Sequence, residues 1–188
     1  MVEKASYTFI ALECNGMKDR SGLKIFGRHW DHLGHPQSIA FVGFEMVYKT
    51  AANVFHLLTP TPKYIYNRKL NCIDESPEMV ALKNRVAGHI RDIKEIRLPE
   101  MIDPMEVWRD IEKILNENPS KHVFIFTHWV LINHLILSMP YLEKALGEKL
   151  LIEASDMVYC TPQGASILRK NRYSSLPFKE NPIKAAKK

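Results

Sequence analysis

Residues 122–135 read HVFIFTHWVLINHL, and this stretch decides the fold. Its first five residues are almost continuously apolar, which is typical of a central strand covered on both faces of a sheet. His128 follows, and the apolar segment 129–138 predicts a helix. Polar side chains within the stretch argue against a membrane span, and we expect none. A buried strand that leads through a histidine turn into a helix therefore forms the predicted centre of the domain.

The segment ahead of this strand predicts a helix that begins at Asp103. Asp103 is a good N-cap, Pro104 suits the first helical position, and Glu106 can reach back to the cap amide. On the other side of the central stretch, residues 157–160 and 165–168 predict a hairpin around the turn 161–164. The hairpin would close one edge of the sheet.

Toward the N-terminus, residues 6–12 predict a buried strand that ends in the turn Glu13-Cys14-Asn15-Gly16. We expect a long loop over 17–33, then an amphipathic helix over 36–58.

Between that helix and Asp103 the pattern is less regular. Residues 63–66 predict a short strand, Ser76 caps a further helix, and 95–98 fits a short strand or a loop. Strands that alternate with helices predict an α/β fold, a three-layer α/β/α sandwich with a mainly parallel sheet and a C-terminal hairpin.

The length and composition fit one domain over residues 1–168, followed by a basic tail over 169–188. The chain has 188 residues, 46% of them hydrophobic and 25% charged, as in an average globular protein. Its three cysteines, Cys14, Cys72 and Cys160, are far apart and form no CxxC pair. This argues against a disulfide framework and a cysteine zinc site, so we expect an intracellular, reducing compartment.

The order of elements resembles the histidine phosphatase (phosphoglycerate mutase-like) family. In that family a first strand runs into an Arg-His-Gly turn, whose His takes the phosphoryl group, and a later strand runs into a Ser-His-Gly turn. The segment around His128, with its preceding capped helix, is similar to the later part of that pattern, and Leu33–Ser38 resembles the family's Leu-Thr-x-x-Gly-x-x-Gln-Ala segment. The resemblance covers nearly the whole chain. It implies that Asn15 and His128 lie close together at the carboxyl ends of neighbouring strands.

The departures from the family pattern bear on function. Cys14 stands where the family has Arg, and Asn15 stands where it has the nucleophilic His. An Asn amide nitrogen has no available lone pair and cannot form a phosphoenzyme. Trp129 replaces the Gly after the second His, and Arg68 is the nearest candidate for the family's later Arg. We therefore expect a vestigial pocket, with no catalytic residue and no cofactor, made up of Cys14, Asn15, Gly16, Arg68 and His128.

Two other functions stay open at this point. The first is an active phosphomonoesterase or mutase that uses His128 with an unconventional nucleophile. The second is a metal-dependent hydrolase, because His29, Asp31 and His32 resemble part of the His-x-Asp-His-x-Gly core of the metallo-β-lactamase fold. The leading His of that core is missing, since Gly27 stands there. A polar loop that binds no metal is the simpler interpretation.

The tail carries most of the net charge of +5. Residues 169–188 hold seven basic residues against Glu180, which leaves the rest of the chain nearly neutral. Tyr173, Leu176 and Phe178 are side chains of the kind that anchor interfaces, so we expect the tail to bind a protein partner. A nucleic acid is the less favoured acidic partner. The sequence thus predicts an inactive accessory subunit of a larger assembly, and its pI of about 9.0 would suit a mitochondrial complex.

Overall fold

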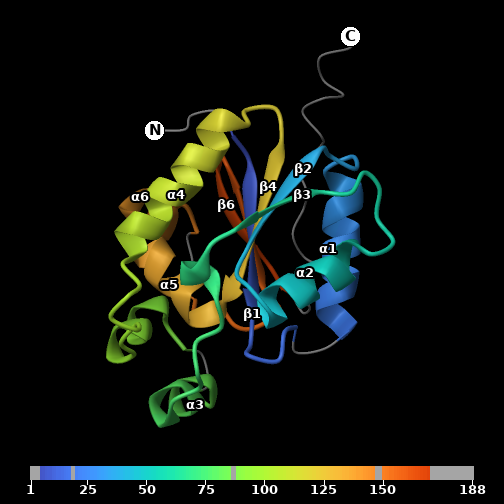
Figure 1. The fold of residues 1–188 in the computed structure, drawn as a ribbon. Helices are drawn as coiled ribbons and strands as arrows, with labels where there is room; N and C mark the ends of the chain where they lie inside the picture. Colours follow the sequence, from blue (N-terminus) through green and yellow to red (C-terminus); the bar gives the residue numbers. More distant parts are fainter. Residues whose placement is uncertain (1–4, 18–19, 86–87, 147–149, 170–188) are drawn as a thin grey trace.

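The computed structural model describes residues 5–17, 20–85, 88–146 and 150–169, and they form a single mixed sheet with helices on both faces (Figure 1). The strand order is β3-β2-β4-β1-β5-β6. The strands are β1 (Tyr7–Leu12), β2 (Ser38–Val42), β3 (Lys63–Tyr66), β4 (His122–His128), β5 (Met157–Thr161) and β6 (Gly164–Leu168). The first four strands are parallel to one another, whereas β5 runs antiparallel to β1 and pairs with β6 as the predicted hairpin.

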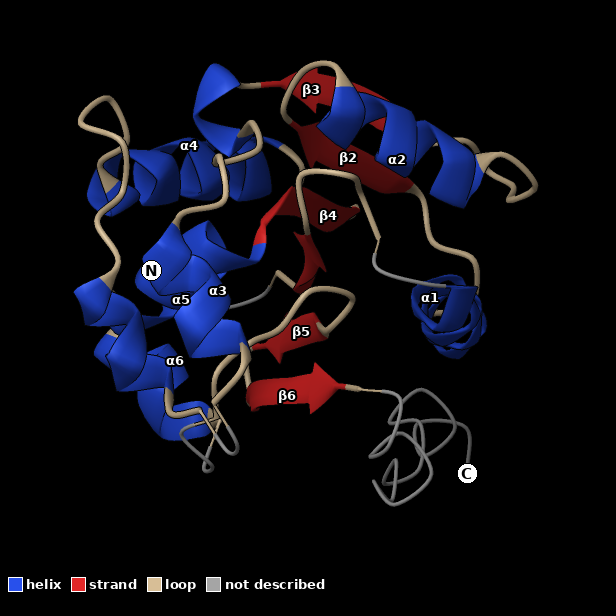
Figure 2. Cartoon of the chain, turned by 90° about the horizontal axis from the view of Figure 1, so that it is seen from below, coloured by secondary structure: helices blue, strands red, loops and turns tan. Residues whose placement is uncertain are grey.

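The helices cover the two faces of this sheet, as Figure 2 shows in a view from below. One face carries α1 (Arg20–His32) and α2 (Met46–Phe55), and the other carries α4 (Pro104–Glu117), α5 (Trp129–Leu137) and α6 (Pro140–Ala145). Helix α3 (Pro77–Lys83) and the 3-10 turns η1 (Arg68–Leu70) and η2 (Ile90–Glu95) lie in the connection from β3 to α4. The α/β/α sandwich with its mainly parallel sheet is confirmed.

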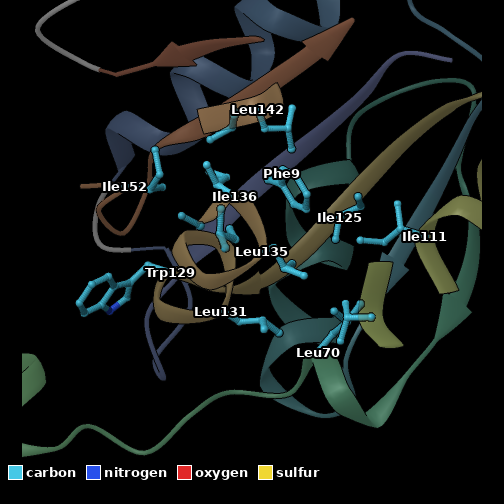
Figure 3. Close-up of a cluster of buried hydrophobic side chains, with 14 of the residues drawn as sticks. Phe9, Leu70, Ile111, Ile125, Trp129, Leu131, Leu135, Ile136, Leu142 and Ile152 are labelled. Atoms are coloured by element: carbon cyan, nitrogen blue, oxygen red, sulfur yellow. The ribbon is translucent and has the colours of Figure 1, made fainter. Parts of the chain in front are cut away.

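Alternation along the strands divides the core between the two faces. On β1, Phe9 packs with the α4 and α5 side, whereas Ile10 packs with the α1 and α2 side. On β4, Ile125 and Phe126 divide in the same way. Figure 3 shows the first of these clusters, in which Phe9, Ile125 and residues of α5 meet. Strands buried on both faces explain why their sequences show no simple alternation of apolar and polar residues.

Two predicted elements were wrong. The expected loop over 17–33 contains α1, which buries Ile25, Phe26 and Trp30 against the sheet. These positions are spaced for one helical face, but Gly22 and Gly27 within the segment favoured a loop.

The expected helix over 36–58 is instead a strand followed by a shorter helix. Residues 38–42, SIAFV, form β2 and are buried along their whole length, and α2 begins only at Met46. Ile39 and Val42 happen to have helical spacing, although the run is rich in β-forming residues. Glu45, with φ of 49°, ends any continuous helix before α2. Residues 95–98 form no strand; Glu95 ends η2.

Arg169, the first residue of the predicted tail, contacts the domain. The Arg169 side chain binds Asp156 through Nε at 2.9 Å and through Nη2, and it also donates to the Leu151 carbonyl. Arg169 therefore belongs to the domain. Residues 170–188, which carry Tyr173, Leu176 and Phe178, lie outside the described residues. Among the helices that the structure describes, none is long and apolar enough to cross a membrane.

Candidate functional site

The predicted pocket lies where β1 and β4 end side by side. The two strands are parallel neighbours, and Leu12 pairs in register with His128. The turn 13–16 follows β1 directly, and α5 begins directly after His128. The carboxyl ends of parallel strands at such a point are where open α/β sheets build their sites. The predicted pairing of the first strand with the 122–126 strand is confirmed.

The turn after β1 is tight and rests on α2. Glu13 and Gly16 exchange two backbone hydrogen bonds, of 2.8 and 2.9 Å. Gly16 has φ of 95°, and a Cβ there would lie 2.6 Å from Thr50 Oγ1. Asn15 is exposed at the turn, in contrast to the buried His128. The turn thus keeps the geometry that needs glycine, while its exposed side chain is an amide.

His128 is an N-cap as well as the end of β4. Its side chain is 2% exposed, and Nδ1 accepts a hydrogen bond from the Val130 amide at 3.4 Å. Burial, with a smaller contribution from the nearby Lys83 ammonium, lowers the pKa of His128 to about 4. The imidazole is therefore neutral at physiological pH, with one nitrogen used by the helix it caps.

Trp129 covers the position next to this histidine. Its side chain is 1% exposed, and its ring centroid lies 5.8 Å from that of His128. The indole lies at the edge of the core cluster, directed away from the other labelled side chains in Figure 3. Its Nε1 finds no hydrogen-bond acceptor among the described residues. The indole fills space that a glycine would leave open.

A small cavity beside Trp129 is lined by one amine, that of Lys83, and by carboxylates. This cavity has a volume of about 40 Å³ and is lined by Glu13, Lys83, Trp129, Leu151, Glu153 and Ala154. Lys83 pairs with Glu13 at 3.0 Å and also with Glu75. These pairings raise the pKa of Lys83, although burial opposes them, and lower the pKa of Glu75. Lys83 and its carboxylate partners were not found from the sequence, because Glu13 lies far from Lys83 along the chain and the eight-residue spacing of Glu75 and Lys83 matches no motif.

Cys14 contacts the segment after η1. Its Sγ donates to the Ile73 carbonyl at 2.8 Å, while Cys72 Sγ donates to the Glu13 carbonyl at 3.3 Å. Burial, followed by the charge and the hydrogen bond of Cys14, raises the pKa of Cys72 to about 12. The sequence separated these two cysteines, and the fold brings them together.

Arg68 stands at the start of η1 with an exposed side chain. The neighbouring residues of that segment make the contacts with the pocket: Thr127 on β4 donates to the Leu70 carbonyl at 3.0 Å, and Cys72 bonds the turn. Of the five predicted pocket residues, Cys14, Asn15, Gly16 and His128 lie at the ends of the two central strands.

The three metal candidates do not share one site. His29 on α1 is fully buried, and its Nε2 is 2.8 Å from Thr8 Oγ1. Asp31 is exposed and pairs with His35 at 2.9 Å. Within the described residues, no group of three or more His, Cys, Asp and Glu is arranged to hold a metal ion.

His29 belongs instead to a buried hydrogen-bond network. Thr8 Oγ1 lies between His29 Nε2 and His122 Nε2, at 2.8 and 2.9 Å, and His122 Nδ1 reaches Ser6 Oγ at 3.0 Å. Burial lowers the pKa of His29 to about 3 and lowers that of His122 well below its usual value. Both rings are neutral parts of the core. The sequence did not predict this network, because His122, at the start of β4, and His29 are far apart in the chain and match no motif.

A larger, more open groove lies beside the pocket. It has a volume of about 560 Å³ and runs between the start of α3 and residues 95–99, with Ile73 and Asp74 at one side. Its charged lining residues are Asp74, Glu78, Glu95 and Arg97. Carboxylates therefore outnumber cations here as well.

Comparison with known proteins gives the fold. No family model matches the sequence, and no curated protein matches it. Among solved structures, the protein histidine phosphatase SixA complexed with tungstate is similar with a TM-score of 0.54 at 10% identity, over 89% of this chain and 99% of that one. Phosphoglycerate mutase from Bacillus anthracis str. Sterne is similar with a TM-score of 0.51 at 13% identity, over 88% and 93% of the two chains. The chain has the histidine phosphatase, phosphoglycerate mutase-like fold.

Proposed function

We propose that this protein is a catalytically inactive member of the histidine phosphatase fold that serves as an accessory subunit of a larger protein assembly. The observation that carries the proposal is the charge of the pocket at the ends of β1 and β4. Glu13 and Glu153 line it with a single amine, Lys83, which is already paired with Glu13 and Glu75. A phosphomonoester dianion would meet a net negative surface there.

The nucleophile position supports the same proposal. Asn15 occupies the turn after β1, and its amide cannot accept and pass on a phosphoryl group. Cys14, in place of an arginine, bonds a backbone carbonyl and offers no bidentate donor to phosphate. His128 is neutral, buried and engaged as a helix cap. Each departure removes a different requirement of phosphoryl transfer.

Space is the third argument. The cavity of about 40 Å³ beside Trp129 is far below the roughly 300 Å³ at which small-molecule sites begin. The neighbouring groove of about 560 Å³ is large enough, but carboxylates outnumber cations in its lining. Trp129 takes up the room beside His128. A substrate would have to displace a buried indole, and the cost of exposing it opposes binding.

A role as a subunit is the remaining part of the proposal. The predicted anchors Tyr173, Leu176 and Phe178 lie among basic residues at the end of a chain whose remainder is nearly neutral. Aromatic and aliphatic anchors with a charged rim are typical of interfaces. A protein with an acidic, apolar-centred surface is the partner this composition fits.

Oxyanion binding tests the inactive pocket directly. Titration of the purified full chain with inorganic phosphate or tungstate, followed by calorimetry and thermal shift, should give no saturable signal at millimolar concentration. Saturable binding that is lost in His128→Ala would overturn the proposal.

The native mass of the tagged protein, isolated from its own cells, tests the accessory role. The assembly should survive His56→Gln and dissociate when Tyr173, Leu176 and Phe178 are all changed to Ser. A protein that stays monomeric in its own cells would contradict the accessory role.

A further inference from the structure

The contact between Cys14 and Cys72 joins two segments far apart in sequence. Cys14 lies in the turn after β1, and Cys72 lies two residues after η1. Each sulfur donates to the carbonyl of the residue next to the other cysteine, Ile73 or Glu13. Burial and the neighbouring Cys14 thiol raise the pKa of Cys72 to about 12. Crossed contacts of this kind place both sulfurs between two adjacent backbone stretches.

We propose that Cys14 and Cys72 are a redox-active dithiol that oxidises to an intramolecular disulfide and clamps the turn after β1 to the segment between η1 and α3. A disulfide needs Cβ atoms about 3.5–4.5 Å apart. The crossed hydrogen bonds place each sulfur against the backbone beside the other cysteine, which is the approach that such a bond requires. Both cysteines are half-buried, so a small oxidant reaches them. The dithiol is a modification site at the edge of the predicted pocket, and its chemistry is thiol–disulfide exchange, not phosphoryl transfer.

The backbone on both sides of the dithiol is already held in place. On the first side, Gly16 closes the turn against Thr50. On the second, the Leu70 carbonyl accepts from Thr127, and Asn71 Oδ1 accepts from the Phe44 amide at 2.6 Å. Since both segments are fixed by bonds that do not involve sulfur, oxidation needs little movement. A disulfide that forms without strain is the stable kind.

The third cysteine provides a matched contrast. Cys160 lies on β5, is 1% exposed and is packed in the core cluster that also holds Tyr7. Its Sγ donates a long hydrogen bond of 3.9 Å to the Val158 carbonyl two residues away. Burial raises the pKa of Cys160 to about 12. A buried thiol without a thiol neighbour is inert toward soluble disulfides.

The exchange is balanced with glutathione disulfide as oxidant. The Cys14 thiolate attacks one glutathione sulfur, which breaks the glutathione S–S bond, forms a mixed disulfide and releases one glutathione thiolate. Cys72, which keeps its proton at neutral pH, loses it to that leaving thiolate as its sulfur attacks Cys14 Sγ. The second glutathione leaves and takes up the proton that Cys14 had given to solvent. Two protein thiols become one disulfide, and one glutathione disulfide becomes two glutathione thiols.

Oxidation closes a loop of nearly sixty residues. A cross-link over a loop of that length restricts the unfolded chain and should raise the melting temperature by about 10 °C in a domain of this size. The clamp also holds the turn that carries Asn15 against the start of α3. The inference does not depend on whether the pocket is catalytically active.

The test uses the purified full chain equilibrated with graded ratios of reduced and oxidised glutathione. Alkylation, digestion and mass spectrometry should find a Cys14–Cys72 cross-linked peptide pair, with Cys160 alkylated as a free thiol. The melting temperature should rise with the fraction cross-linked. Cys14→Ser and Cys72→Ser should each abolish the rise, whereas Cys160→Ala should retain it.

Two results would overturn the proposal. One is the accumulation of separate glutathione adducts, or of disulfide-linked dimers, with no Cys14–Cys72 peptide pair. The other is a cross-link that leaves the melting temperature unchanged or lowers it, which would mean that the native geometry does not accommodate it. If a serine variant fails to fold, the reduced and oxidised wild-type chains are compared with each other. The presence of the Cys14–Cys72 peptide pair and the difference in melting temperature between the two chains then decide.

Discussion

Leu12 and His128 are register partners at the ends of β1 and β4. The pairing places the turn 13–16 and the start of α5 at one edge of the sheet, where this fold has room for a site. At that edge lie an ion-paired lysine, a buried indole and two cysteines that exchange crossed hydrogen bonds with the backbone beside each other.

Gly16 should be required for stability. Gly16→Ala would force a left-handed φ on an alanine and bring its Cβ to 2.6 Å from Thr50 Oγ1. We expect a loss of about 1–3 kcal/mol in the free energy of unfolding, measured by urea titration.

The matched control for this change is Gly27→Ala. Gly27 lies inside α1, and a Cβ there meets no atom within 4 Å. Alanine should stabilise the helix by about 0.5–1 kcal/mol. Equal effects of the two substitutions would contradict the described turn.

Trp129 should behave as a packing residue. Trp129→Ala leaves a cavity beside His128 and should cost about 3–5 kcal/mol of unfolding free energy. Trp129→Phe keeps most of the apolar volume and removes an Nε1 that has no acceptor among the described residues, so it should cost less than about 1.5 kcal/mol. Calorimetric melting of both variants checks this, and a Phe variant as unstable as the Ala variant would show that the indole N–H has a partner.

The domain should lose stability as the pH falls below about 6.5. His29 and His128 have folded pKa values of about 3 and 4, and that of His122 is also lowered well below 6.5. Between pH 6.5 and 4 the unfolded chain binds protons at these rings and the folded chain does not. Above pH 6.5 the three rings make their full contribution to the free energy of unfolding. Below pH 6.5 each ring lowers that free energy by about 1.4 kcal/mol per pH unit, until the pH reaches the pKa of the ring in the folded chain.

Urea unfolding at several pH values measures this slope. His128→Asn should reduce the slope by about one ring's share, 1.4 kcal/mol per pH unit. His56→Gln is the control for the loss of one exposed imidazole. A flat stability profile down to pH 4 would mean that the three rings are not buried in the neutral form.

Arg169 should stabilise the domain more than an exposed arginine does. Arg169→Ala leaves Asp156, which is 4% exposed, without its charged partner, and should cost about 3–5 kcal/mol of unfolding free energy. Arg91→Ala breaks the exposed pair with Glu143 and should cost less than about 1 kcal/mol of unfolding free energy.

Deletion of residues 170–188 should leave the melting temperature of the domain nearly unchanged. A truncated protein with a clearly lower melting temperature would show that those residues are part of the fold.

The sequence predicted the centre of the fold better than its edges. The strand 122–128 and the helix after it have strong, long signals, and so does the helix that Asp103 begins. β2 was mistaken for helix because a strand buried on both faces has no period of its own, and two of its apolar residues have helical spacing. α1 was missed because glycines and histidines stand between its apolar residues, and a segment of that composition is typical of a loop.

The site was predictable only where strand ends carry it. Asn15 follows β1 and His128 ends β4, and the topology of the fold places both at one edge of the sheet. The crossed hydrogen bonds of Cys14 and Cys72 and the pairing of Lys83 with Glu13 join segments that are distant in the chain. The Thr8 network between His29 and His122 does the same inside the core. Such pairs follow from tertiary packing, and one sequence holds no local pattern for them.

Hydrolysis of a generic aryl phosphate by the purified full chain tests the central claim most directly. Wild type, His128→Ala and Asn15→His should all show turnover equal to a buffer blank, because Asn15→His alone restores neither a phosphate clamp nor an open, cationic pocket. Wild-type turnover above background that disappears in His128→Ala would contradict the account and make the protein an active phosphatase.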